Sequence, residues 1–394
     1  MPNFFVFLLI LFLIAALLRV EFFFTVVYFL GAVYLFSHLW MRGTQKRLRV
    51  QRRFLDHAFF GDRVVVDLQV HNRGWLPIPW LSVHDSLPVQ LATPPFHRQV
   101  LSLGAREKKT LHYTLSCHQR GYYAVGPLSV QTGDLLGIVR SRLERIESSY
   151  LIVYPRVLPL QQLGLPTRSP QVVLPASSQL FEDPSRVMGV RDYRRGDSPR
   201  RIHWTATASA GRLLVKQYQP AVARETLICL DLDQEGYGRR QRYTATELAI
   251  VVAASLANHI VVHEGLPVGL TTEAWDPLAN DRAYFFLPPR PERAHLMSLL
   301  EVLARAQVTS GTSFPNLLRR SSMNLPWGAT LSVITGRQSE GLFDTLVYLR
   351  RAGFAVALIL VQPTPPPPAL RERADLMGVP IHKVWQDGDL EAWR

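Results

Sequence analysis

A strongly basic run is the part of this sequence whose residue types most clearly suggest chemistry. Residues 189–204 read GVRDYRRGDSPRRIHW, with five arginines within eleven positions. Arginine presents a planar fork of N–H donors that matches the oxygen atoms of phosphate and carboxylate groups. Near the start of a helix, such a run could bind an anionic ligand or an acidic protein surface. The five candidate residues are Arg191, Arg194, Arg195, Arg200 and Arg201.

The same run also has a structural interpretation. Asp192 and Asp197 can neutralise some of the arginines. Asp197 or Ser198 suits the cap of a helix, with Pro199 in its first turn and Gly211 as its stop. The residues assigned to this structural motif are Tyr193, Gly196, Asp197, Ile202 and Trp204, of which Tyr193, Ile202 and Trp204 would pack against a sheet. We favour this structural role for Asp197, Ile202 and Trp204, because a capped turn would explain all three residues. The role of the arginines stays open.

The sequence does not suggest catalysis. His203 could act as a general base, but neither a nucleophile nor a carboxylate lies at a suitable spacing, so we expect a packed or surface histidine. The sequence contains no P-loop, dinucleotide fingerprint, zinc motif or nucleophile elbow. We therefore predict a protein that is not an enzyme.

Alternating strands and helices are predicted downstream of the basic run. A capping-box pattern, Thr244 to Glu247, opens the first of the helices. This alternation predicts a mostly parallel sheet with helices on both faces, in an α/β domain that includes the basic motif and spans 186–394. The predicted strands are 225–232, 267–271, 329–335, 354–361 and 381–385, and the predicted helices are 244–263, 293–306 and 342–351.

The region upstream of the basic run has a different pattern. Short strands with alternating polar and apolar residues, separated by Pro and Gly, fill residues 54–154. This pattern predicts an antiparallel β-sandwich of immunoglobulin-like size. Residues 155–185 are rich in Pro, Ser and Gln and are expected to form a linker.

The N-terminus is the most apolar part of the chain. Residues 4–18 contain no polar side chain, and a second apolar run covers 22–40. These runs predict a transmembrane hairpin within residues 1–41, with helices at about 4–20 and 22–40. A cleaved signal peptide followed by one span is the alternative, although Met1-Pro2-Asn3 lacks the basic start of such signals. The basic juxtamembrane segment 42–53 predicts a cell-membrane protein with both termini in the cytoplasm.

The net charge of +13 is concentrated in two places. The segment 42–53 and the segment 186–216 each carry a net charge of +6, which leaves about +1 for everything else. The first segment suits attraction to anionic membrane lipid. A charge so localised does not indicate a nucleic-acid-binding protein, so no nucleic-acid partner is expected. Cys117 and Cys229 lie far apart in apolar stretches, which is typical of a reducing compartment.

The basic run also carries a resemblance. The chain resembles the bacterial and archaeal proteins of the domain-of-unknown-function fifty-eight family, whose central segment reads R-(D/E)-Y-x-x-G-D-x-x-R-x-I-x-W. Further support comes from Gln119-Arg120-Gly121-Tyr122-Tyr123, Gly126-Pro127 and residues 266–270. The resemblance implies a membrane hairpin, a β-rich region and a von Willebrand factor A-like domain with a Rossmann-like α/β fold. It also implies a protein partner, a MoxR-type AAA ATPase, in assembly or envelope-related processes.

The implied domain raises the question of a metal. Its better-known relatives hold Mg²⁺ at an Asp-x-Ser-x-Ser loop after the first strand. Here the aligned loop replaces both serines by acids, and the later loop, where relatives offer another Asp, reads Thr335-Gly336-Arg337. Three carboxylates would neutralise a cation and weaken its attraction for an acidic ligand. The candidate ligands are Asp231, Asp233 and Glu235.

Two functional hypotheses follow. The first is a non-enzymatic, membrane-anchored interaction protein that needs no cofactor. The second is a metal-dependent enzyme or anion-binding protein that uses the acidic loop 231–235 or the basic segment 186–216. Within the second hypothesis, a divalent cation at the acidic loop is an open alternative.

Overall fold

The chain folds into two compact units. The computed structural model describes residues 2–18, 21–133, 140–160, 182–194, 199, 202–220 and 225–391. Unit 1 comprises Met1–Arg156 and Leu300–Ala306, and unit 2 comprises Val157–Leu299 and Gln307–Arg394. In unit 1, Arg120 Nη1 donates hydrogen bonds of 2.7–3.0 Å to the carbonyl oxygens of Leu303, Ala304 and Ala306.

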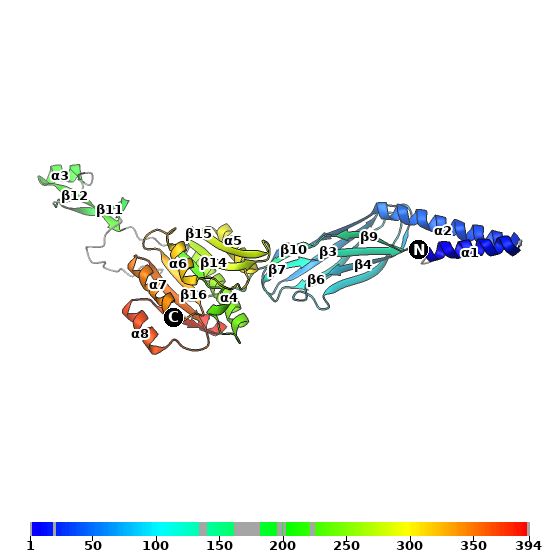
Figure 1. The fold of residues 1–394 in the computed structure, drawn as a ribbon. Helices are drawn as coiled ribbons and strands as arrows, with labels where there is room; N and C mark the ends of the chain where they lie inside the picture. Colours follow the sequence, from blue (N-terminus) through cyan, green and yellow to red (C-terminus); the bar gives the residue numbers. More distant parts are fainter. Residues whose placement is uncertain are drawn as a thin grey trace. The chain divides into compact units, whose positions relative to one another are not determined.

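Unit 1 begins with two apolar helices, α1 (Pro2–Leu18) and α2 (Glu21–Arg47), which lie side by side (Figure 1). The rings of Phe12 and Phe24 pack edge to face at 6.2 Å. The window Glu21–Thr44 is long and apolar enough to cross a membrane, and only 6% of it is buried. With 17 residues, α1 is about 25 Å long, slightly short of a hydrocarbon core of about 30 Å.

Between α2 and the end of its first segment, unit 1 contains β-strands in three sheets. Their orders are β1-β3-β6, β5-β4-β8-β9 and β2-β10-β7, and the pairing is antiparallel except between β2 and β10. Alternation along β3 buries every second side chain, as a sheet with one apolar face requires. Strands of the first two sheets share one apolar core, which includes Leu68 and Leu81. The strands are β1 (Leu48–Arg53), β2 (His57–Ala58), β3 (Arg63–Asn72), β4 (Ile78–Ser86), β5 (Phe96–Leu103), β6 (Lys108–Ser116), β7 (Gly121–Val125), β8 (Leu128–Gly133), β9 (Arg140–Ile146) and β10 (Ser149–Val153).

The basic segment after α2 differs from the expectation. Residues up to Arg47 continue α2, and β1 then pairs with β3. Within β1, Arg52 forms a buried ion pair with Asp85 at 2.9 Å, with side chains 1% and 0% exposed. Tyr113 Oη donates to the other oxygen of Asp85 at 2.7 Å, and burial raises the pKa of Tyr113. Arg52 is therefore a core residue of unit 1, and its charge is not available to lipid.

Unit 2 contains a six-stranded sheet in the order β15-β14-β13-β16-β17-β18. Its strands are parallel except for β15, which pairs antiparallel with β14 at the edge. From β13 on, the strands and helices are β13 (Thr226–Leu230), α4 (Arg242–Asn258), β14 (Val268–Asp276), β15 (Asp281–Arg290), α5 (Arg293–Arg305), α6 (Phe314–Ser322), β16 (Thr330–Thr335), α7 (Glu340–Arg351), β17 (Ala355–Val361), α8 (Pro368–Leu376), β18 (Ile381–Val384) and α9 (Asp387–Glu391). The last part of α5, from Leu300, belongs to unit 1.

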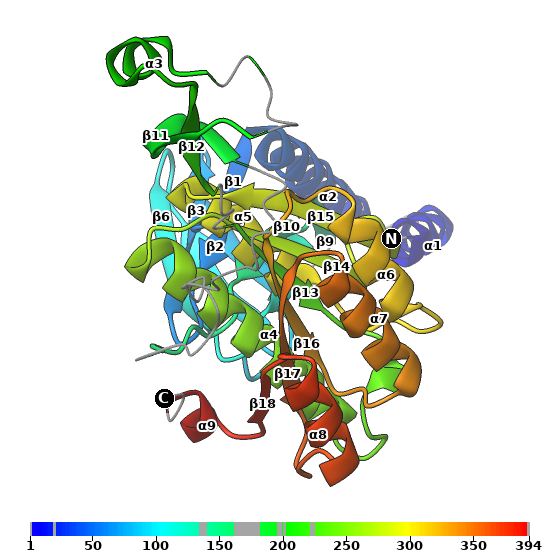
Figure 2. The same cartoon turned by 90° about the vertical axis from the view of Figure 1, so that its left-hand side faces the viewer.

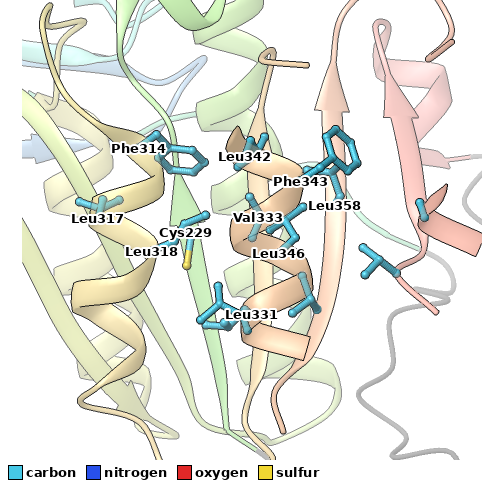
Figure 3. Packing of buried hydrophobic residues seen from close by; sticks show 14 of the residues in the cluster. Cys229, Phe314, Leu317, Leu318, Leu331, Val333, Leu342, Phe343, Leu346 and Leu358 are labelled. Atoms are coloured by element: carbon cyan, nitrogen blue, oxygen red, sulfur yellow. The ribbon is translucent and has the colours of Figure 1, made fainter. Parts of the chain in front are cut away.

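Helices cover both faces of this sheet, with α4 on one side and α6 and α7 on the other (Figure 2). All five residues of β13 are buried, as expected for a strand covered on both faces. Cys229 and Val333 pack with Phe314 of α6 and Leu346 of α7 in one apolar cluster (Figure 3). The helical segment Arg242–His263 could also span a membrane by composition, but 78% of its apolar window is buried, so it is a core helix.

The predicted α/β pattern is present, with differences at particular elements. The edge strand β15 and the helix α6 were not predicted from the sequence. The prediction that the helix starts with a capping box at Thr244 is wrong, because α4 begins at Arg242 and Gln241 is its N-cap residue. Residues 182–192, partly assigned to the linker, form the strand β11.

Candidate functional site

The carboxyl ends of β13 and β16 meet at the centre of the six-stranded sheet. The chain leaves β13 toward α4 on one face and leaves β16 toward α7 on the other (Figure 2). In open α/β sheets, this point of reversal forms a crevice that commonly binds ligands. Asp231 follows β13 directly and Thr335 ends β16, so both lie at this edge.

Asp231 is held by hydrogen bonds on both oxygens of its carboxylate. Its Oδ2 accepts from the Thr335 hydroxyl at 2.7 Å, and its Oδ1 accepts from the Asp233 amide at 3.1 Å. The Tyr237 hydroxyl donates to the backbone oxygen of Asp231 at 2.6 Å. The Asp231 side chain is 1% exposed, so these bonds replace those that water would supply.

Arg337 joins the two neighbouring acids. Its Nη2 lies 3.0 Å from Asp233 Oδ2, and its Nε lies 3.5 Å from Asp231 Oδ2. The Arg337 amide donates to Thr335 Oγ1 at 3.0 Å, which turns the loop back over the strand end. The Asp233 side chain is also 1% exposed, whereas that of Arg337 is 21% exposed. One guanidinium therefore bridges two buried carboxylates.

The electrostatics of Asp231 reflect opposing influences. Burial raises the pKa of the Asp231 carboxyl, while the Thr335 hydroxyl and the Arg337 charge act to lower it. Burial likewise raises the pKa of Tyr237 well above its usual value, so its hydroxyl stays protonated and can donate.

The Mg²⁺ site implied by the resemblance does not fit these residues. Mg²⁺ requires oxygen ligands at about 2.0–2.1 Å in octahedral geometry. Asp231 and Asp233 come together here, but Arg337 contacts both carboxylates, and Glu235 is exposed. Among the residues that the structure describes, no cluster of three His, Cys, Asp or Glu side chains could hold a metal ion.

A small cavity of about 260 Å³ lies beside the acidic loop. The Gln234 amide donates to the Thr309 carbonyl at 2.8 Å, and the Thr309 amide donates to the Leu232 carbonyl at 3.0 Å, so residues 307–309 extend along the loop. The cavity is lined by Gln234, Trp275, Asp281, Arg282, Val308, Thr309 and Ser310. Its volume suits a few ordered waters or one short side chain better than a drug-sized ligand, whose pockets begin at about 300 Å³.

The basic motif forms a separate substructure. The antiparallel strands β11 (Glu182–Asp192) and β12 (Leu214–Pro220) flank the short helix α3 (Trp204–Ala210). His203 caps α3 by accepting from the Ala206 amide at 3.3 Å, and Gly211 ends α3 in the left-handed conformation, with φ 63°. The predicted stop at Gly211 is confirmed, whereas the helix begins later than expected.

The predicted binding arginines are only partly described. Arg194 is exposed, and Arg191 donates to the Asp192 carbonyl at 3.1 Å. Asp192 also pairs with Arg212 at 3.3 Å. Three of the five arginines (Arg195, Arg200 and Arg201), together with Gly196 and Asp197, lie outside the described residues.

The three predicted packing residues differ in their surroundings. Ile202 is partly buried and bridges to Val215 of β12. Trp204 is 67% exposed at the start of α3, so the expectation that it packs against a sheet is wrong. Tyr193 is partly buried, and its amide donates to the Leu213 carbonyl at 3.0 Å. Within the described part of the motif, strand pairing and the two caps of α3 account for the fold without Trp204.

Comparison with known proteins places this motif in a family. Residues 189–342 match the family described as Protein of unknown function DUF58. The chain is also similar to the uncharacterized protein YeaD of Bacillus subtilis (strain 168), with 23% identity over 309 residues, covering 77% of this chain and 72% of the relative. Residues 189–342 therefore belong to the DUF58 family. This matched region holds both the basic motif and the Asp231–Arg337 site.

Solved structures resemble only parts of this chain. The CARDB domain of PF1109 from Pyrococcus furiosus, crystallised with di-metal ions, is 19% identical over 27% of this chain and 86% of its own, with a TM-score of 0.22. A β-glucosidase from Listeria innocua is 14% identical over 28% of this chain and 16% of its own, with a TM-score of 0.20. Both TM-scores are too low to indicate a shared fold or function.

Three residues of the site, Thr335, Arg337 and Tyr237, were not among the sequence-based candidates. The chain separates Arg337 from Asp231 by 106 positions, and only the pairing of β13 with β16 brings them together. The tripeptide Thr335-Gly336-Arg337 at the end of a predicted strand was the available signal, because parallel neighbours place their carboxyl ends at one edge.

Proposed function

We propose that this protein is a membrane-anchored, non-enzymatic interaction protein that presents a von Willebrand factor A-like docking domain in the cytoplasm. The observation that carries this proposal is the bridge that Arg337 forms between Asp231 and Asp233. Asp231 and Asp233 bond to Arg337, Thr335 and the backbone, an arrangement that favours a fixed surface over a reacting group. The strand order, with a single antiparallel edge strand, is consistent with the domain type implied by the family resemblance.

Anchoring is supported by α2. The side chains of Phe29, Leu35 and Phe36 are more than half exposed, although they are large and apolar. Exposed apolar surface of this kind is typical of a helix that contacts lipid. Arg42, Lys46 and other exposed basic residues follow, which supports a cytoplasmic location for the remaining chain. We further propose that the β-rich part of unit 1 is an immunoglobulin-like sandwich.

The anchoring proposal predicts a specific fractionation result. Full-length protein should stay in the membrane pellet after alkaline carbonate extraction, and a chain that lacks residues 1–47 should be released. Protease added outside spheroplasts should leave units 1 and 2 intact, whereas protease added to inverted vesicles should digest them. Release of the full-length chain by carbonate, or digestion from outside, would contradict the proposal.

The proposed docking partner carries an acidic surface. The resemblance implies a MoxR-type AAA ATPase, and the exposed arginines around β11 suit an acidic surface on such a partner. Tagged full-length protein, solubilised in detergent, should therefore retain the ATPase in a pull-down. Reversing two charges, in Arg191→Glu/Arg194→Glu, should weaken this retention by at least about tenfold, a loss of roughly 1.4 kcal/mol.

A matched variant controls for the change in net charge. Arg351 and Arg371 are exposed on α7 and α8, away from β11 in the sequence, so Arg351→Glu/Arg371→Glu alters the charge equally. This control should retain the ATPase as the wild type does. Equal losses in both variants would show a general charge effect, and no loss in either would remove β11 from the interface.

A further inference from the structure

At the carboxyl ends of β13 and β16, the chain itself supplies a cation beside two carboxylates. The guanidinium of Arg337 reaches Asp233 through Nη2 at 3.0 Å and Asp231 through Nε at 3.5 Å. Both carboxylates are almost fully removed from water, with side chains 1% exposed. Two buried carboxylates so close together repel each other, and the positive charge of Arg337 beside them offsets part of that repulsion.

The surrounding loops are shaped to hold this arginine. A Cβ at Gly236 would lie 2.8 Å from Asp231 Oδ2, and a Cβ at Gly336 would lie 2.6 Å from Cδ1 of Tyr237. Real Cβ atoms do not approach other heavy atoms so closely, so both positions need glycine. The absence of side chains at these glycines lets the two loops lie close to each other beside Asp231 and Arg337.

We propose that Arg337 is the resident cation of this site and takes the place of a divalent metal ion between Asp231 and Asp233. An arginine is always protonated and needs no binding equilibrium. The carboxyl edge of the sheet therefore keeps its shape at any magnesium concentration.

Removal of the guanidinium should allow Asp231 and Asp233 to bind a divalent metal ion. In Arg337→Ala, two carboxylates and the Thr335 hydroxyl lose their cation, and hard oxygen ligands of this kind suit Mn²⁺ and Mg²⁺. The experiment compares Mn²⁺ binding by purified full-length protein, measured by electron paramagnetic resonance, for wild type, Arg337→Ala, Asp231→Asn/Arg337→Ala and the surface control Arg351→Ala.

We expect wild type and Arg351→Ala to show no Asp231-dependent Mn²⁺ binding and no change in melting temperature between EDTA and Mn²⁺. Arg337→Ala should bind Mn²⁺ at least about tenfold more tightly than wild type, and saturating Mn²⁺ should raise its melting temperature by roughly 5 °C. The added Asp231→Asn change should abolish both effects. If Arg337→Ala does not fold, Arg337→Gln provides the same test with a neutral side chain of similar length.

Two results would overturn the proposal. One is Mn²⁺ binding by the wild type that Asp231→Asn abolishes, because the arginine would then not exclude the metal. The other is a folded Arg337→Ala or Arg337→Gln protein without any gain in Mn²⁺ affinity, because Arg337 would then not occupy a cation position.

Discussion

Replacing Asp85 by alanine should lower the free energy of unfolding of unit 1 by about 3–5 kcal/mol. The substitution leaves Arg52, whose side chain is 1% exposed, without its carboxylate partner. The remaining acceptors of the guanidinium are neutral, namely the Glu147 carbonyl and the Ser149 hydroxyl, each at 3.0 Å. A buried charge with only neutral partners is strongly unfavourable, and the Tyr113 hydroxyl also loses its acceptor.

Amide hydrogen exchange in β4 and β8 of the full-length protein measures this loss, because it reports the opening of unit 1 separately from unit 2. Asp67→Ala is the matched control, since Asp67 pairs with His112 at 2.7 Å on an exposed part of the same unit and should contribute less than about 1 kcal/mol. The double variant Arg52→Met/Asp85→Leu removes both charges and should recover most of the stability. A loss below about 1 kcal/mol for Asp85→Ala would show that the pair is not structurally important.

The buried pair also shows where sequence reasoning fails. Arg52 was interpreted as one of six juxtamembrane charges, because net charge per segment cannot distinguish an exposed arginine from a buried one. Its position in β1 alternates with Arg49 and Arg53, which are exposed. The decisive partner, Asp85, lies 33 residues away on β4, and a single sequence does not reveal that contact.

The α/β pattern was predictable because the central strands of the sheet are buried on both faces and contain few charged residues. The strand β16 was expected at 329–335 and spans Thr330–Thr335, since all its residues are buried and apolar side chains alternate with small hydroxyl side chains over most of its length. The edge strand β15 was missed because its residues are exposed or only half-buried and end in two prolines. The helix α6 was missed because its nine residues include Pro, Asn and two serines, which weaken a helical pattern.

The candidate site was predictable only in its acidic half. Acids that follow a buried strand mark the carboxyl edge of a parallel sheet, so Asp231 and Asp233 could be singled out. The sequence could not show that Arg337 contacts these acids, because they lie 106 and 104 positions away along the chain. Glu235 appeared equivalent to its neighbours in sequence, yet it is exposed and contributes its amide, which donates to Asp233 Oδ1 at 3.2 Å.

Arg337→Ala should destabilise unit 2 by about 3–5 kcal/mol at neutral pH in the absence of divalent metal, because it leaves two buried carboxylates without a positive charge. Asp231→Ala should cost less, since one guanidinium and one carboxylate, that of Asp233, would remain paired. Arg351→Ala, an exposed change on α7, should stay within about 0.5 kcal/mol of wild type. Urea unfolding followed by exchange of the β13 and β16 amides measures the three values.

The pH dependence separates the electrostatic cause from lost packing. Burial already raises the pKa of Asp231, and Arg337 opposes that rise, so the variant raises this pKa further. A carboxyl whose folded pKa exceeds its unfolded pKa keeps a proton that the unfolded chain releases, so stability falls as pH rises from about 4 through the folded pKa. The deficit of Arg337→Ala relative to wild type should therefore be small near pH 4 and grow toward pH 7. A deficit that is equal at both pH values would instead indicate that the aliphatic stem of Arg337 stabilises the loop by packing, and that its charge does not matter.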